Sequence, residues 1–307
     1  MSLLVVGSVA FDTLETPYGV AERIVGGSGA YISLTASQFI KPVHLVSVVG
    51  RDFPQSFLDE LKSRGVGLDG LEIRKDEDSF FWHGRYHKDL NTRDTLETRL
   101  NVLATFNPVV PEVAKTADYL ILGNLTPDVQ RGVIEQLTRK PKLIVLDTMN
   151  FWMDVALESL HRTLLMVDVL TINDEEARQL SGVYSLRKAA RKILQMGPTY
   201  LIIKKGEHGA LLFNKEEVFF APALPLEEVF DPTGAGDTFA GGVIGYIAKT
   251  GDTSFENLKR AIIYGSAMAS FCVERFGTER LLNLTERDIQ MRLDEFQSLT
   301  KLDMVRI

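Results

Sequence analysis

The feature that most constrains the fold of this chain is a series of short apolar runs separated by amphipathic stretches. The runs span residues 3–6, 43–49, 119–122, 143–146, 167–172, 200–203 and 210–213. Short runs that are apolar throughout are typical of strands buried on both faces. Between them, stretches such as 57–61, 129–137 and 186–196 repeat apolar residues at helical spacing. Strands and helices that alternate along a chain predict an α/β fold around a central, mostly parallel sheet, with helices covering it from about residue 254 onward.

Two segments interrupt this alternation. Residues 13–25 and 71–103 mix charged and β-prone residues, including the aromatic run Phe80-Phe81-Trp82. This composition favours strands outside the main sheet, which would form a small β lid or a platform for a homodimer. An ordinary surface hairpin accounts for the same residues. Since the sequence has no repeat of fixed period, we expect residues 1–307 to form a single domain that carries the lid.

The composition narrows the range of partners. The chain has 34 basic and 41 acidic residues and a net charge of -7. Nucleic acids are also negatively charged, so we expect no nucleic-acid partner. The N-terminus reaches Gly7 with neither a basic region nor a long apolar segment, which predicts no signal peptide and no membrane partner. The single cysteine, Cys272, lies in an apolar stretch and predicts a buried thiol. A cytoplasmic location is the simplest expectation.

The segment with the most chemical information covers residues 230–242 and reads FDPTGAGDTFAGG. Pro232 favours an extended entry into it. Gly234 and Gly236 remove side chains where a turn enters a helix, so backbone N–H groups can approach an anion such as phosphate. Asp237 then lies in the first helical turn, where it can accept a proton from a hydroxyl that attacks phosphorus. An aspartate that only complements the helix dipole accounts for a bare Gly-x-Gly-Asp equally well.

The full string resembles the second signature of the ribokinase family, also called the PfkB carbohydrate kinases. The resemblance extends over nearly the whole chain and implies a three-layer α/β/α fold. It also implies transfer of the γ-phosphoryl group of ATP to an alcohol, with Mg²⁺ as cofactor. By this resemblance Asp237 is the catalytic base, and the backbone at Gly234, Ala235 and Gly236 forms an anion hole.

The resemblance also assigns residues to the acceptor. Asp12, after the first apolar run, matches the aspartate that holds substrate hydroxyls, and Gly27 matches a glycine that lets the sugar approach the backbone. Tyr31 stands where ribokinase-like members commonly carry a sugar-binding asparagine. A phenol cannot supply an amide's paired donor and acceptor, so this departure predicts an unusual acceptor or one bound without that contact. From the lid, Trp82 and Arg85 are further acceptor candidates, and packing within the lid explains them as well.

For metal ions, the resemblance points to two places. Residues 171–176 match the family's Asn-x-x-Glu element, which implies that Asn173 and Glu176 organise Mg²⁺, water and phosphate, with Glu176 acting through water. Acidic residues in a first helical turn are also a common stabilising pattern. Asp231 and Thr233 match positions that help some members hold a monovalent cation such as K⁺, with Thr233 on the nucleotide side. Shaping the turn is the simpler role for both.

Further elements are assigned to the nucleotide and the phosphates. Lys204, Gly206 and Gly209 match the Thr-x-Gly-x-x-Gly turn beside the nucleotide, with lysine in place of the usual threonine. Ser266 corresponds to the helix that lines the adenine pocket, although close helix packing explains its small neighbours equally well. Asn150 follows an apolar run where the family often has an Asp-x-Asn element near the substrate.

Three functions therefore remain open at this point. The first is an ATP-dependent kinase for a hydroxyl of a sugar or sugar-like molecule. A nucleoside kinase of the same family is the alternative within the enzyme class, and Tyr31 and the lid aromatics favour it. Outside that class, the departures at Tyr31 and Lys204 are compatible with a nucleotide-sensing binding protein of weak catalytic activity.

Overall fold

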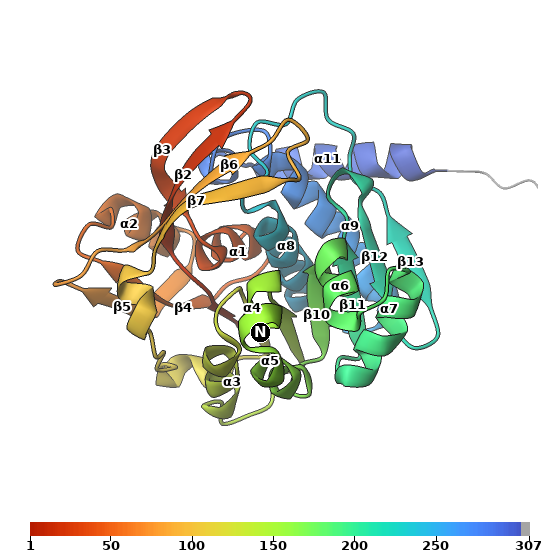
Figure 1. The fold of residues 1–307 in the computed structure, drawn as a ribbon, viewed down its shortest axis with the longest axis horizontal. Coiled ribbons are helices and arrows are strands. Elements are labelled where there is room, and N and C mark those ends of the chain that lie inside the picture. The colour runs from red at the N-terminus through yellow and green to blue at the C-terminus, as the bar shows by residue number, and fades with distance from the viewer. Residues whose placement is uncertain (302–307) are drawn as a thin grey trace, which may run out of the picture.

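The computed structural model describes residues 1–301, and its centre is a nine-stranded sheet (Figure 1). The strands are, in spatial order, β13 (Val218–Ala221), β12 (Ala210–Phe213), β11 (Tyr200–Lys204), β10 (Val169–Asn173), β9 (Leu143–Asp147), β8 (Tyr119–Leu122), β1 (Leu3–Val6), β4 (Val43–Gly50) and β5 (Val66–Arg74). Neighbours from β11 to β5 pair in parallel, and β12 and β13 add an antiparallel edge. All seven apolar runs are strands, as predicted. The sequence pattern missed β5 and β13, because both are edge strands with exposed residues and lack a continuous apolar run.

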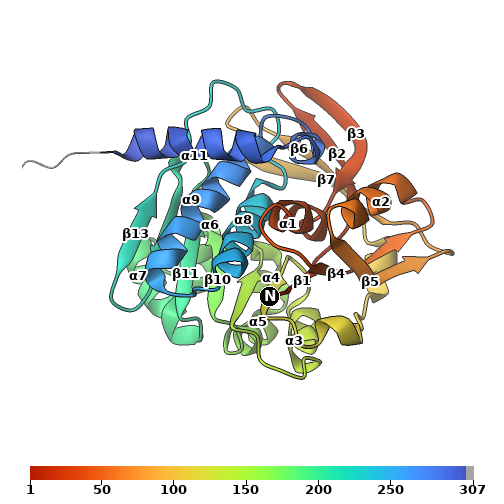
Figure 2. The ribbon, with the colours of Figure 1, turned by 180° about the vertical axis from the view of Figure 1, so that it is seen from behind.

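Helices cover both faces of the sheet, which gives the predicted three layers (Figures 1 and 2). One face carries α1 (Ser28–Ala36), α2 (Gln55–Ser63), α8 (Ala235–Thr250) and α9 (Phe255–Cys272); the other carries α3 (Pro127–Glu135), α5 (Leu157–Leu164), α6 (Asp174–Ser181) and α7 (Leu186–Ile193). Alternate residues of β1 pack into the two cores: Leu3 and Val5 into the first, Leu4 and Val6 into the second. Within residues 1–301, no helix combines the length and apolarity needed to cross a bilayer.

Shorter elements complete the chain. They are the helices α4 (Asn150–Val155) and α10 (Glu279–Leu282), the C-terminal helix α11 (Glu286–Thr300), and the 3-10 turns η1 (Asn101–Thr105), η2 (Glu112–Ala114), η3 (Leu194–Met196) and η4 (Gly206–His208). Helix α11 packs on α9, so the helical C-terminal part finishes the fold on one face, as expected from the sequence.

A second sheet projects from one end of the molecule and is called the lid (Figure 1). Its four strands lie in the order β3 (Gly19–Gly26), β2 (Ala10–Thr16), β6 (Phe80–Tyr86) and β7 (Arg93–Arg99). The predicted lid segments, 13–25 and 71–103, contain most of it. Residues 71–74, however, belong to the main sheet, because β5 continues its parallel pairing with β4 as far as Arg74.

Candidate active site

The carboxyl ends of three neighbouring strands bring polar side chains together. Strand β9 ends at Asp147, β10 at Asn173 and β11 at Lys204, and Asn173 is in register with Lys204. Ligands of open parallel sheets gather at this edge. The ammonium of Lys204 lies 2.6 Å from a carboxylate oxygen of the buried Asp147. Burial alone would lower the pKa of Lys204, but Asp147 and Glu176 outweigh it and raise that pKa. Lys204 is therefore a fixed cation at the strand ends.

Glu176 enters the same site from the first turn of α6. Its backbone N–H donates to Oδ1 of Asn173 at 2.8 Å, and its carboxylate accepts the N–H of Asn173 at 2.7 Å, which is a reciprocal capping box. The side chain is buried, and burial raises the pKa of Glu176 to about 7, with Lys204 opposing and Asp147 adding to the rise. This carboxylate thus helps to start α6. Because its pKa is raised, a cation that binds nearby would favour its ionised form.

The turn at residues 231–237 is held in shape by the buried Asp231. Its two carboxylate oxygens accept the N–H groups of Thr233, at 2.8 Å, and of Gly277, at 2.9 Å. Gly234 has φ of +74° and directly precedes α8. A Cβ on Gly234 would lie 2.3 Å from the ring of Tyr31. Glycine is therefore required here both by the backbone conformation and by the neighbouring ring.

The turn leaves backbone donors unused. In the described part of the chain, the N–H groups of Gly234, Gly236 and Asp237 donate no hydrogen bond, whereas Ala235 donates to the Pro232 carbonyl at 3.2 Å. These free groups lie at the N-terminus of the 16-residue helix α8, where the helix dipole favours an anion. Of the three residues expected to form an anion hole, Gly234 and Gly236 have free N–H groups and Ala235 does not.

Asp237 lies in the first turn of α8, beside this donor set. The residue as a whole is half-buried, and its surroundings raise the pKa of the carboxyl group to about 7: the loss of hydration acts most strongly, Asp147 adds to the effect, and Lys204 and Arg93 oppose it. The ammonium of Lys204 is close by, since a Cβ on Gly236 would lie 3.2 Å from it. A carboxylate with a pKa near neutrality, next to a cation and free N–H groups, is suited to take a proton from a hydroxyl.

Asp12 faces the same space from the lid. Gly26 makes room for it, because a Cβ there would lie 1.9 Å from its carboxylate. Burial, followed by the charges of Asp231 and Asp237, raises the pKa of Asp12 to about 8, and Arg93 opposes the rise. Gly27 caps α1 with φ of +92° and lies against the Ser8 carbonyl. The two acceptor candidates, Asp12 and Gly27, therefore lie at one junction between lid and main sheet.

Tyr31 lies behind the turn. It is 1% exposed and packs in a cluster with Met268, Phe271 and Cys272, with its ring against Gly234. Its hydroxyl is buried and makes no hydrogen bond within the described residues. The phenol therefore packs against the turn at 231–237, a role that a hydrogen-bonding asparagine would not fill in the same way.

The side chains of the lid strands lie on two faces, an inner face toward the main sheet and an outer face. Strand β6 pairs with β2 so that Trp82 is in register with Asp12, and four residues further on the Tyr86 hydroxyl accepts a 3.1 Å hydrogen bond from the Thr233 hydroxyl. Trp82 and Tyr86 therefore share the inner face, because side chains alternate along a strand. Arg85 falls on the outer face, where its guanidinium pairs with Glu15 at 2.6 Å and is half exposed. The interior position expected for Arg85 is thus not the one it occupies.

The comparisons with known proteins bear on this geometry. The model of the pfkB family of carbohydrate kinases matches residues 2–284. The chain belongs to this family. A cytidine kinase from Thermococcus kodakarensis is 29% identical over 250 residues, which is 80% of this chain and 87% of that protein. A nucleoside kinase from Methanothermobacter thermautotrophicus is 26% identical over 306 residues, covering 90% and 91% of the two chains.

Solved structures agree on the fold of this PfkB kinase. A putative ribokinase II from E. coli in its apo form has a TM-score of 0.80 at 20% identity, covering 95% of this chain and 99% of that one. The same protein is also known in complex with ATP and Mg²⁺, with a TM-score of 0.75 at 19% identity and the same coverage of both chains. This kinase is therefore a phosphotransferase with an alcohol group as acceptor, built on the ribokinase-like α/β fold.

Two charged residues of this site, Asp147 and Arg93, were not predicted from the sequence. Asp147 was not singled out, because its pairing with Lys204 depends on the register of β9, β10 and β11. Arg93 was overlooked because it begins a strand in a charged stretch. One signal was available for Arg85: side chains alternate along a strand, so Arg85 and Trp82, three positions apart, must lie on opposite faces and cannot both face the acceptor.

The remaining predicted residues are the nucleotide candidates Gly206, Gly209 and Ser266 and the substrate candidate Asn150. Gly206 and Gly209 have φ of +54° and +81°, and a Cβ on Gly209 would lie 2.0 Å from the Ala221 carbonyl, so that glycine is required by the fold. Ser266 is buried on α9, beside a glycine that packs directly on α8. Asn150 is exposed at the start of α4 and accepts only the N–H of the next residue through its side chain.

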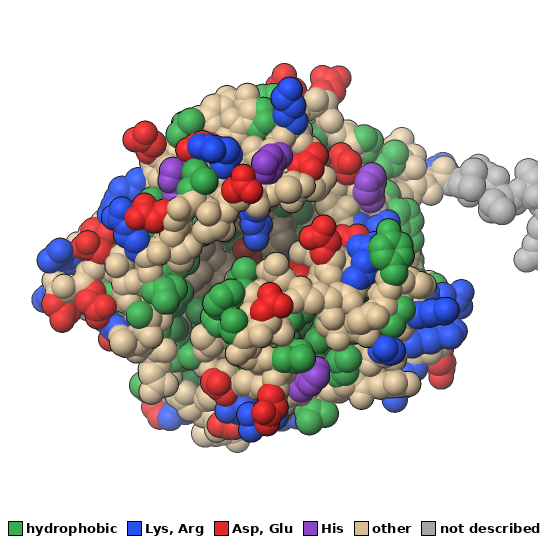
Figure 3. All heavy atoms as spheres, viewed as in Figure 1, with side chains coloured by type: hydrophobic (Ala, Val, Ile, Leu, Met, Phe, Trp, Pro, Cys, Tyr) green, Lys and Arg blue, Asp and Glu red, His purple; other side chains and the backbone are tan. Residues whose placement is uncertain are grey.

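The kinase's carboxylates fit a divalent cation of the magnesium type. The acidic groups Asp12, Asp147, Glu176 and Asp237 adjoin one cleft, and the cations near them are Lys204 and Arg93. Among residues 1–301, no three His, Cys, Asp or Glu side chains form a ready metal cage. Mg²⁺ suits such a site, because it keeps several waters and uses few protein ligands alongside substrate phosphates. Figure 3 shows a hollow on this face, below the lid strands.

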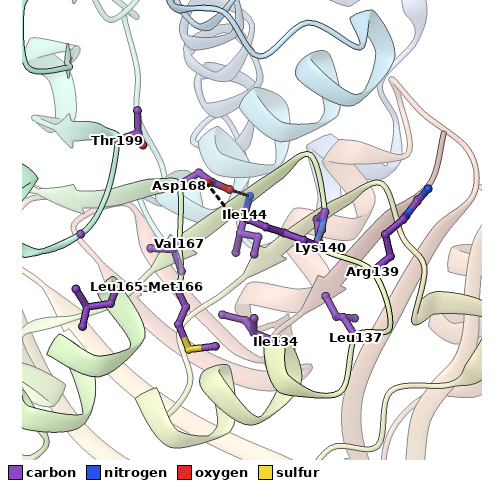
Figure 4. Close-up of a pocket in the computed structure, with 12 residues that line it drawn as sticks. Ile134, Leu137, Arg139, Lys140, Ile144, Leu165, Met166, Val167, Asp168 and Thr199 are labelled. Carbon is purple, nitrogen blue, oxygen red and sulfur yellow. Dashed lines mark hydrogen bonds and ion pairs between the residues drawn. The ribbon is translucent and has the colours of Figure 1, made fainter.

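A second hollow lies at the opposite ends of the strands. It measures about 510 Å³ and is lined by Ile134, Leu137, Arg139, Lys140, Pro141, Ile144, Leu165, Met166, Val167, Asp168, Gly197 and Thr199 (Figure 4). Its carboxylate, Asp168, accepts the N–H of Ile144 at 2.8 Å and lies 3.7 Å from Lys140. Arg139 donates to Asp118 at 3.1 Å. Its polar groups thus already have partners, which does not favour a catalytic role.

Proposed function

We propose that this kinase transfers the γ-phosphoryl group of ATP, with Mg²⁺ as cofactor, to a hydroxyl of a sugar or sugar-like molecule. The proposal rests on one arrangement: Asp237, with a pKa of about 7, beside the free N–H groups of Gly234 and Gly236 and opposite Asp12. This places a base, an anion site and a group for holding an alcohol around one cleft.

In the reaction, the acceptor hydroxyl gives its proton to Asp237 as its oxygen attacks the γ-phosphorus. A new oxygen–phosphorus bond forms, the bond to the β,γ-bridging oxygen breaks, and ADP leaves. The N–H groups of Gly234 and Gly236 donate to phosphoryl oxygens as charge develops on them. Asp12 orients the acceptor through its two oxygens. Little covalent chemistry is asked of the protein, and positioning and charge provide the acceleration.

Mg²⁺, when bound, supplies positive charge to the phosphate oxygens of ATP. Glu176 would hold it through water, fixed in place by its capping box with Asn173, and Asp147, whose charge acts on Glu176, would share the task. Because burial raises the pKa of Glu176 to about 7, the cation would release a proton on binding.

The nucleotide side of the site uses a different set of residues. Lys204, already fixed next to Gly236, would contact the phosphates, and the Gly206–Gly209 turn would let the nucleotide approach the backbone. Thr233 and Ser266 complete this side, with Thr233 also anchoring the lid through Tyr86. A lysine offers a point charge in place of the usual threonine hydroxyl.

Asp231 is the proposed contact for a monovalent cation such as K⁺. Each of its carboxylate oxygens accepts one backbone N–H, from Thr233 or Gly277, and so keeps lone pairs for a cation. Replacing K⁺ by tetramethylammonium in the assay should lower kcat several-fold if the cation stabilises this turn. Equal rates with both ions would remove K⁺ from the proposal and leave Asp231 as the residue that shapes the turn.

A nucleoside acceptor is the second candidate. The two curated relatives described above are named as a cytidine kinase and a nucleoside kinase. On this chain, Trp82 lies on the inner lid face in register with Asp12, where an indole can stack on a base while the carboxylate holds ribose hydroxyls. Measuring kcat/KM over a panel of free sugars and nucleosides separates the two candidates.

The central test is Asp237→Asn on the best acceptor of that panel. We expect nucleotide affinity within about threefold of wild type and a kcat reduced by about 10³-fold, because a positioned base accelerates proton transfer by about 10²–10⁴-fold. Asp168→Asn at the opposite end of the sheet is the matched control and should keep its rate. Near-normal turnover by Asp237→Asn would refute the proposed role of the base.

The remaining expectations concern assembly and location. The lid ends in the edge strand β3, whose free backbone groups and exposed Val20 suit pairing with a second copy, so we propose a homodimer formed through the lid. The molar mass in solution tests it, and a monomer at micromolar concentration would contradict it. We also propose that the chain forms a single kinase domain and that it is located in the cytoplasm.

A further inference from the structure

The lid carries a second arginine, Arg93, at the start of β7. It is in register with Tyr86, so both point to the inner face of the lid. Its guanidinium lies 5.7 Å from the centre of the Trp82 ring, and the Trp82 indole N–H donates to Thr95 on the same face at 3.2 Å. The outer face carries Arg85 and its partner Glu15. Arg93 is therefore turned toward the cleft, and Arg85 away from it.

Two contacts hold this end of the lid over the cleft. On one side of Arg93, the Tyr86 hydroxyl is 3.1 Å from the Thr233 hydroxyl in the anion-binding turn. On the other side, Asn91 lies against Gly206, where a Cβ would come within 2.8 Å of its side-chain oxygen. The short loop between β6 and β7 is itself fixed, because Asp89 accepts the N–H groups of Asn91 and Thr92. The lid thus touches both the turn at 231–237 and the turn at 206–209.

Arg93 differs from the other lid arginines in its charged neighbours. Within residues 1–301, its guanidinium forms no salt bridge with any carboxylate, although the other lid arginines Arg23, Arg85 and Arg99 each have one. Its positive charge nevertheless acts on three carboxyl groups below it, Asp12, Glu176 and Asp237, and lowers the pKa of each against the effect of burial. Arg93 lies within range of the acceptor, metal and base residues at once.

We propose that Arg93 contacts the phosphoryl group as it passes from ATP to the acceptor. This inference rests on the proposed function. The position between acceptor, metal and base residues is where the equatorial oxygens of that group gather charge in the transition state. A guanidinium presents a planar fork of donors that matches such oxygens, and it stays protonated throughout, so the proton of the hydroxyl still goes to Asp237.

The experiment compares Arg93→Gln with Arg93→Lys and with the control Arg99→Gln on the same strand. Arg99 is exposed and paired with Glu97 at 2.7 Å, so its loss should leave the rate unchanged. For Arg93→Gln we expect kcat to fall by about 10²–10³-fold with both KM values within about threefold. Arg93→Lys should recover part of the loss. In Arg93→Gln the acidic limb of the kcat/KM profile should also move to higher pH, because a cation near Asp237 is gone.

Trapping with ADP, Mg²⁺ and aluminium fluoride gives a readout that needs no acceptor. Wild type should bind ADP more tightly when aluminium fluoride is present, and Arg93→Gln should lose that gain while binding ADP alone normally. Equal trapping by both proteins would overturn the inference, as would a kcat within threefold of wild type. A rise in the acceptor KM alone would make Arg93 an acceptor-binding residue and would also overturn it. If wild type phosphorylates no acceptor, the proposed function fails, and the trapping comparison still decides the role of Arg93.

Discussion

The two ends of the parallel sheet of this PfkB kinase differ in how far their polar groups are satisfied. At the amino ends of β9, β10 and β11, the hollow of about 510 Å³ holds an aspartate that accepts a backbone N–H and pairs with a lysine. At the carboxyl ends, burial raises the pKa values of Asp12, Glu176 and Asp237, and backbone donors at Gly234 and Gly236 are unused.

This difference teaches that buried charge without a full set of partners marks the candidate active end of the sheet, and that the presence of a hollow alone does not. Polar groups that are buried without full compensation cost stability, and a protein retains them where a ligand supplies the missing partners. The amino end has partners already and can hold the fold together. Four tests, the last of them a pair of substitutions, examine whether catalysis depends on the carboxyl end and stability on the amino end.

The largest effect is expected from Gly234→Ala at the carboxyl end. The new Cβ would meet the Tyr31 ring at 2.3 Å in a backbone with φ of +74°, so the turn must shift and its N–H groups lose their alignment. We expect kcat to fall by about 10³-fold. Gly182→Ala is the matched control, since Gly182 has φ of +65° with nothing within 4 Å. A similar loss in both variants would mean that general backbone strain, and not the anion site, is responsible.

The next effect is that of Lys204→Met. It removes the cation 2.6 Å from Asp147 and beside Gly236, so kcat/KM for ATP should fall by about 10²-fold through lost phosphate contact. Calorimetric titration with ATP and steady-state kinetics measure the two parts of this change. Because the single substitution leaves Asp147 buried without its partner, the double variant with Asp147→Asn separates folding from catalysis. An unchanged affinity for ATP in Lys204→Met would exclude contact with the phosphates.

Much of the fold and part of the site were predictable from local sequence. The apolar runs identified seven strands, and the string at residues 231–237 predicted a glycine turn at a helix start with Asp237 in the first helical turn, since both depend on neighbours along the chain. Long-range register decided the rest. Arg85 and Arg93 are both lid arginines, and only the pairing of β6 with β2 and β7 shows which one faces inward. Tyr31 was assigned from a motif position, and its burial behind Gly234 depends on how α1 packs against α8.

The third effect is a pH dependence at the carboxyl end. Asp237 accepts a proton only when it is ionised, and its pKa is raised to about 7, mainly by burial. The value of kcat/KM should therefore rise about tenfold per pH unit below 7 and level off above it. Lys204 lowers the pKa of Asp237, so Lys204→Met should move this limb to higher pH. A limb near pH 4 in the wild type would mean that the proton acceptor is not a carboxyl group whose pKa is raised by burial.

The smallest effect concerns stability and sets Asp12→Asn against Asp168→Ala. The folded pKa of Asp12, about 8, lies above its ordinary value of 3.8, so its contribution to stability is complete below pH 3.8 and is lost as pH rises through 8. Asparagine has no such loss. At pH 7 and without ligands, Asp12→Asn should therefore unfold a few degrees, about 3 °C, above wild type, with a gain that grows between pH 4 and 8.

Asp168→Ala should act in the opposite direction. It leaves the N–H of Ile144 without its acceptor and Lys140 without its partner, at a cost of about 1–2 kcal/mol, and kcat should be unchanged. Thermal unfolding at several pH values, together with rates on the same samples, measures both variants. A loss of stability in Asp12→Asn, or a loss of rate in Asp168→Ala, would mean that the two ends of the sheet do not divide catalysis and stability. By the proposed function, the carboxyl end holds Asp12 at a cost to the ligand-free protein, and the acceptor that this carboxylate would bind offsets that cost.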